Sequence, residues 1–69
     1  MELIPVDSDA LRAVGYDPAR RILRVAYRGG GVYDYLEVDP DLFEELRQPH
    51  PWHRLSGRVK AHAYRRVDG

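Results

Sequence analysis

Hydrophobic and polar residues alternate most regularly from residue 21 to residue 28. Because successive strand residues point to opposite faces of a sheet, this pattern predicts a strand with one buried face. The two faces carry Leu23, Val25 and Tyr27 on the buried side and Ile22, Arg24, Ala26 and Arg28 on the other. A weaker strand is predicted over residues 10–16, and the sequence Asp17-Pro18-Ala19-Arg20 is typical of the turn between the two.

Three consecutive glycines, Gly29 to Gly31, follow the regular strand. Glycine adopts the positive φ angles that tight hairpins require, so a turn is predicted here. Residues 32–38 then return antiparallel to residues 21–28 as the next strand.

The length of this loop decides which residues face each other. If all three glycines form the loop, Tyr27 faces Tyr33 and Val25 faces Tyr35. A two-residue loop would instead bring Asp34 opposite Val25. We favour the first register, because it places tyrosines rather than an aspartate on the apolar face, with the rings at least partly in the core.

A first helix is predicted to begin at Asp39-Pro40-Asp41 and to end before Pro49. Asp39 is a typical capping acceptor, Pro40 suits the first helical position, and an acid in the first turn favours the helix dipole. The buried stripe of this helix is predicted to contain Leu42, Phe43 and Leu46.

A second helix is predicted to open at Pro51. Its spacing places Trp52, Leu55 and Val59 on one side and Arg54 and Arg58 on the far side. The tail over residues 61–67 has the composition of an extended segment that could add an edge strand through Tyr64.

These elements predict one α+β domain over residues 1–69, with a three-stranded antiparallel meander followed by two short helices packed on one face. A chain of this size buries only about 60% of its unfolded surface, so a single modest core is expected. The chain has no cysteine and no apolar stretch of signal-peptide or membrane-spanning length. We therefore expect a soluble cytoplasmic protein.

Charge is unevenly distributed along a chain whose formal net charge is zero. Residues 1–45 hold ten acidic and five basic residues, and residues 46–69 hold one acidic and six basic residues, which gives −5 and +5. A basic segment of this kind can recruit polyanions, and it can equally be attracted to the acidic half across the fold. Of these two interpretations we favour the second.

Several short stretches carry a family resemblance: Gly15-Tyr16-Asp17-Pro18, Leu23-x-Val25-x-Tyr27, Gly30 through Tyr33-x-Tyr35-x-x-Val38-x-Pro40, and Leu55-Ser56-Gly57-Arg58-Val59 with Tyr64. In this order and spacing, the chain resembles the KTSC family. That family is named for a domain at the C-terminus of some lysyl-tRNA synthetases, and it also occurs as small stand-alone bacterial proteins with a central YxY motif. Its activity is not established, and its association with a synthetase implies RNA as a ligand. Residues 49–53 depart from the family's pattern, which is usually richer in serine and glycine there.

Aromatic residues on a sheet with nearby arginines can stack unpaired bases and hold phosphates. The candidate nucleic-acid-binding residues are Tyr33, Tyr35, Arg54, Arg58, Lys60, Arg65 and Arg66, with Tyr27 as a further candidate stacking ring. The alternative is that the tyrosines pack under the helices and the arginines form a solvated surface. A second functional hypothesis is a protein-interaction domain that docks a partner at a sheet edge or near Trp52.

Catalysis and metal binding are not expected. His50, His53 and His62 lack cysteine partners, and Asp68 is the only acid after Glu45. The chain contains only two serines and no threonine, and neither serine lies in a nucleophile motif. We therefore expect no enzymatic activity, no cofactor and no metal.

Overall fold

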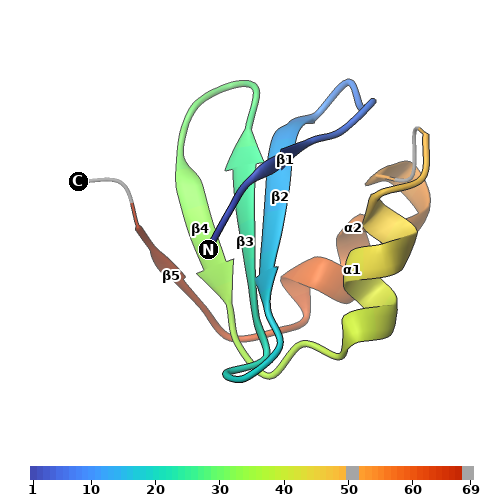
Figure 1. Ribbon diagram of the computed structural model, residues 1–69. Coiled ribbons are helices and arrows are strands. Elements are labelled where there is room, and N and C mark those ends of the chain that lie inside the picture. The colour runs from blue at the N-terminus through green and yellow to red at the C-terminus, as the bar shows by residue number, and fades with distance from the viewer. Residues whose placement is uncertain (50–51, 68–69) are drawn as a thin grey trace.

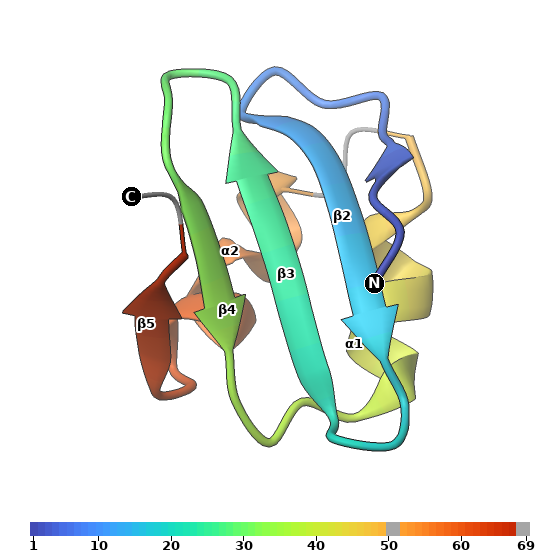
Figure 2. The same cartoon turned by 60° about the vertical axis from the view of Figure 1, so that its left-hand side comes forward.

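The computed structural model describes residues 1–49 and 52–67. These residues form one antiparallel sheet with the strand order β1-β2-β3-β4-β5, and two helices cover one of its faces (Figures 1 and 2). The elements are β1 (Ile4–Pro5), β2 (Leu11–Asp17), β3 (Ile22–Tyr27), β4 (Val32–Tyr35), α1 (Pro40–Leu46), α2 (Trp52–Lys60) and β5 (Tyr64–Arg66). The start of α2 is described only from Trp52, so the predicted start at Pro51 lies outside the described residues.

The α+β class, the antiparallel sheet and the two helices are confirmed, but the prediction of three strands is wrong. The described residues form five strands, because short edge strands flank the predicted meander on both sides. β1 has only two residues and contains Pro5. It is too short to show the alternation of hydrophobic and polar residues from which a strand is predicted. β5 is the predicted extension through Tyr64, and it pairs with β4.

The β3–β4 register differs from both predicted alternatives. Val25 faces Tyr33 and Leu23 faces Tyr35, a shift of two residues from the favoured register. The Tyr27 amide donates to the Gly31 carbonyl at 3.0 Å, so Gly31 already pairs with β3 instead of belonging to the loop. An even shift leaves every side chain on its predicted face. Val25 and Tyr35 therefore share the helix-facing side of the sheet, as expected.

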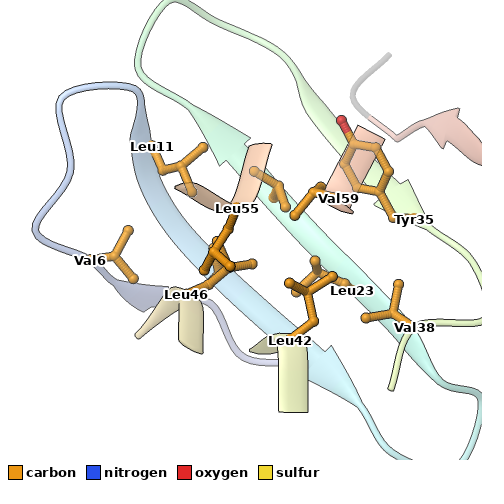
Figure 3. Packing of buried hydrophobic residues seen from close by; sticks show 11 residues of the cluster. Val6, Leu11, Leu23, Tyr35, Val38, Leu42, Leu46, Leu55 and Val59 are labelled. Carbon is orange, nitrogen blue, oxygen red and sulfur yellow. The ribbon is translucent and has the colours of Figure 1, made fainter. Parts of the chain in front are cut away.

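The helix-facing side of the sheet and both helices enclose the core (Figure 3). Its fully buried side chains include Leu23 and Val25 from β3, Leu46 from α1, and Leu55 and Val59 from α2. The predicted stripes of both helices are confirmed in this cluster, with Phe43 and Trp52 packed at its margin. Among the described residues, no helix has the length and apolarity needed to cross a membrane.

The start of α1 is placed as predicted, but its expected side-chain cap is not formed. Asp39 has the extended backbone of a capping residue, with φ −73° and ψ 149°. Its carboxylate, however, pairs with Arg21 instead of accepting the amides of the described first turn. A sequence pattern identifies a good acceptor at this position, but it does not include a guanidinium contributed by the β2–β3 turn.

Candidate nucleic-acid interface

Aromatic rings form a continuous row from α2 across the edge of the sheet. The ring centroids of Trp52 and Tyr27 lie 5.6 Å apart, and those of Tyr27 and Tyr33 lie 5.8 Å apart. The row continues onto β5, where the Tyr64 ring lies 5.8 Å from both Tyr33 and Tyr35. Most of these contacts are edge-to-face, the geometry that aromatic pairs prefer.

Strand alternation brings these rings together. Tyr27 on β3 and the two YxY tyrosines on β4 point to the helix-facing side of the sheet, and Tyr64 lies directly opposite Tyr35. Gly31 leaves room for the Tyr33 ring, because a Cβ atom at this glycine would lie only 3.0 Å from Tyr33 Cε2. Gly31 also has a φ of 93°, which side-chain-bearing residues rarely adopt.

Burial divides the two tyrosines of the YxY motif. Tyr35 is only 4% exposed and belongs to the core, beside Val59 (Figure 3). Its hydroxyl lies 2.7 Å from the Tyr27 hydroxyl. Tyr33 is half-buried, and Tyr64 is 63% exposed. The expectation that Tyr35 offers its ring face for stacking therefore needs correction, and the accessible rings are those of Tyr33 and Tyr64.

Two cations border the accessible rings. Arg66 Cζ lies 5.7 Å from the Tyr33 ring centroid, and Lys60 Nζ lies 5.8 Å from the Trp52 ring centroid. Between α2 and β5, a recess of about 190 Å³ is lined by Tyr35, Lys60 and Tyr64. We refer to these rings and cations together, namely Tyr33, Trp52, Lys60, Tyr64 and Arg66, as the aromatic-basic surface, of which Lys60 and Tyr64 line the recess.

The other predicted basic residues lie away from this surface. Arg58 forms an ion pair with Glu45 of α1 at 2.5 Å, and Arg54 is one helical turn earlier on the same flank of α2. Arg65 points to the opposite face of the sheet, where it lies 3.7 Å from Asp34. Part of the charge asymmetry is therefore neutralised inside the fold, whereas Lys60 and Arg66 accompany the rings.

Two members of the surface, Trp52 and Tyr64, were absent from the predicted site. Tyr64 and Arg66 share a face because they are two residues apart in a strand, a signal that was available once the tail was taken as extended. Trp52 and Lys60 are eight residues apart in α2, a little over two helical turns. The Lys60 side chain reaches back along the helix to the Trp52 ring.

His62 and Ser8 both form hydrogen bonds with the backbone. His62 Nδ1 lies 3.1 Å from the Leu36 carbonyl oxygen, and His50 lies outside the described residues. Within residues 1–49 and 52–67, no group of three histidine or acidic side chains is placed to hold a metal ion. Ser8 Oγ accepts hydrogen bonds from the amides of Ala10 at 3.2 Å and Leu11 at 3.3 Å, which is a turn-capping role.

Alkaline pH is expected to destabilise the protein through Tyr27. Burial, together with its hydrogen bond to Tyr35, raises the pKa of the Tyr27 hydroxyl. The unfolded chain ionises this group near pH 10, so above that pH it binds fewer protons than the folded state. The free energy of unfolding should therefore be unaffected by Tyr27 below about pH 9 and decrease above about pH 10, by at most about 1.4 kcal/mol per pH unit.

Urea unfolding at a series of alkaline pH values measures this effect. Tyr27→Phe should make the decrease shallower, because it removes the titrating hydroxyl. The exposed Tyr64→Phe is the matched control for the loss of one tyrosine hydroxyl. Burial also raises the pKa of Tyr16, whose contribution stays in both variants. Identical slopes in the two variants would contradict the assignment to Tyr27.

Comparison with known proteins places the chain in a family. Residues 7–50 match the KTSC domain. A protein of Tsukamurella paurometabola is 50% identical over 42 residues, 61% of this chain and 63% of that protein, and an uncharacterized protein of Stutzerimonas stutzeri is 31% identical over 99% of this chain and 100% of its own. The crystal structure of a KTSC domain protein from Yersinia pestis superposes with a TM-score of 0.86, at 26% identity and 97% coverage of both chains. The chain therefore belongs to the KTSC domain family, as its motifs indicated.

Proposed function

We propose that this protein binds single-stranded nucleic acid, specifically RNA, on the aromatic-basic surface, without catalysing a reaction. The observation that carries the proposal is the placement of the exposed Tyr64 ring and the half-buried Tyr33 ring next to Lys60 and Arg66. Accessible rings and cations side by side are the two elements that a single-strand binder combines.

The chemistry of the surface favours an unpaired base. A base that stacks on an aromatic side chain gains about 1–3 kcal/mol, and stacking requires that the base is not enclosed in a duplex. The recess beside Tyr64 has room for a small planar group, and Lys60 lines it. We expect a base to lie against Tyr64 while Lys60 and Arg66 contact the flanking phosphates.

Salt dependence of binding tests this proposal. We expect micromolar affinity at low salt for a mixed-sequence single-stranded RNA of about 12 nucleotides, measured by calorimetry. Tyr64→Ala should weaken binding by about 1–3 kcal/mol without changing the salt slope, because stacking releases no counterions. Lys60→Ala combined with Arg66→Ala should reduce the slope of log K against log salt by about 1.4, since each lost phosphate contact removes about 0.7.

A double variant with the same change in charge provides the control. Arg54→Ala combined with Arg58→Ala also removes two positive charges. Both of these lie on the flank of α2 beside α1, away from the aromatic-basic surface. It should change the slope less than the Lys60 and Arg66 pair. Equal changes would show that RNA does not use the aromatic-basic surface. Absence of RNA binding by the unmodified protein at low salt and high concentration would reject the proposal in favour of a protein partner.

A further inference from the structure

Asp34 is a buried carboxylate on the sheet face opposite the helices. It is 1% exposed and accepts two hydrogen bonds from Arg24, at 2.8 Å from Nε to Oδ1 and 3.1 Å from Nη2 to Oδ2. Arg65 approaches the same carboxylate, with 3.7 Å between its Nη2 and Oδ2. Asp34 thus connects three neighbouring strands, because Arg24 lies on β3 and Arg65 on β5.

The strand that carries Arg65 is otherwise attached through its pairing with β4 and through the contacts of Tyr64 and Arg66 with the β4 tyrosines. β5 is three residues long, and all three of its side chains are exposed, so burial of apolar surface contributes little to its docking. Its backbone is joined to β4 where the Leu36 amide donates to Ala63 and the Val67 amide donates to Val32, both at 2.8 Å. A short exposed edge strand of this kind is expected to open locally at low free-energy cost.

Alternation gives β5 two distinct sides. Arg65 lies opposite Asp34 and points to the outer face of the sheet, while Tyr64 and Arg66 point to the aromatic-basic surface. The pairing of β5 with β4 sets which side of β5 faces the recess, and the contact between Arg65 and Asp34 adds a side-chain attachment to that arrangement. The Asp34 carboxylate is buried and held by Arg24, whereas the Arg65 side chain is 63% exposed, so solvent screens this ion pair only from one side.

We infer that Asp34 is a positioning residue for the aromatic-basic surface: it holds Arg65 on the outer face and thereby keeps Tyr64 and Arg66 against Tyr33 and Tyr35. Asp34 itself lies on the far side of the sheet and contacts no ligand. The inference rests on the proposed function, but its first test needs no nucleic acid.

Hydrogen exchange tests the docking of β5 directly. Arg65→Ala leaves the Arg24 contact with Asp34 intact, so the sheet should fold. Protection of the Leu36 and Val67 amides should fall by about twofold to fivefold, as expected for a local opening, while the Val38 amide, which bonds to Arg21 away from β5, should keep its protection. Arg65→Lys should restore part of the loss.

RNA affinity provides the second test, because charge and positioning predict opposite signs. Asp34→Asn removes a negative charge, so unspecific electrostatics would strengthen RNA binding. Loss of positioning should instead weaken it, by about fivefold or more if Tyr64 stacking is lost. Glu45→Gln is the matched control: it removes an acid paired with an arginine of α2 and should not weaken binding.

The outcomes separate the two proposals. Unchanged protection of Leu36 and Val67 in Arg65→Ala would overturn the positioning role, whatever the RNA data show. Lost protection together with unchanged or tighter RNA binding in Asp34→Asn would also overturn it. If the unmodified protein binds no RNA, the proposed function fails, and the exchange measurements still decide whether Asp34 and Arg65 hold β5 in place.

Discussion

Tyr35→Ala is expected to lower the free energy of unfolding by about 3–5 kcal/mol, as large-to-small replacements of buried aromatic residues do. The ring is 4% exposed, packs within the core cluster, and joins its hydroxyl to that of Tyr27. Native domains have a total stability of only about 5–15 kcal/mol, so this loss would remove a large part of it. Urea denaturation followed by far-ultraviolet circular dichroism measures the change.

Two substitutions separate ring packing from hydrogen bonding in this prediction. Tyr35→Phe keeps the ring and removes the hydroxyl, so it should cost only about 1 kcal/mol. Tyr64→Ala removes a ring that is mostly in solvent and should cost less stability than Tyr35→Ala. A Tyr35→Ala protein as stable as Tyr64→Ala would show that the second motif tyrosine is not a core residue.

The second large effect is expected from Leu55→Ala, with a loss of about 2–5 kcal/mol. Leu55 is 1% exposed and connects α2 to the core beneath it (Figure 3). Because α2 also carries Trp52 and Lys60, loosening this helix should weaken RNA binding together with stability. Thermal unfolding by calorimetry and RNA titration on the same variant measure both effects.

Arg54→Ala, at the preceding position on the exposed side of α2, serves as the control. A surface substitution of this kind should change the free energy of unfolding by no more than about 0.5 kcal/mol. If Leu55→Ala had an equally small effect, the helix would not depend on its buried stripe for docking.

Features that depend on local periodicity were predictable from the sequence. The alternation of Leu23, Val25 and Tyr27 assigns the faces of β3 correctly, even though the β3–β4 register is shifted by two residues. Strand faces repeat with period two, so an even shift does not disturb them. The register itself depended on whether Gly31 belongs to the loop or pairs with Tyr27, a choice that composition does not decide.

Features that depend on distant partners were not predictable. Asp39 has the sequence of a helix cap, but Arg21, eighteen residues earlier, takes its carboxylate. Arg65 and Arg66 were both predicted as ligand residues, but as neighbours in β5 they point to opposite faces, and Arg65 lies 3.7 Å from Asp34 on the far one. In the candidate site, Tyr33, Lys60 and Arg66 follow from local pattern, whereas the burial of Tyr35 depends on the packing of α2 over the sheet.

The row of rings gives the protein a built-in optical reporter. Trp52 is the only tryptophan in the chain, and it lies at the end of a row in which each ring is within 6 Å of its neighbour. At such separations, excitation energy absorbed by Tyr27, Tyr33 or Tyr64 is transferred efficiently to the Trp52 indole. The fluorescence emission of an indole is sensitive to its surroundings. Tryptophan emission excited through the tyrosines therefore follows the state of this one surface in unlabelled protein, so occupancy and strand detachment can be observed in the same sample.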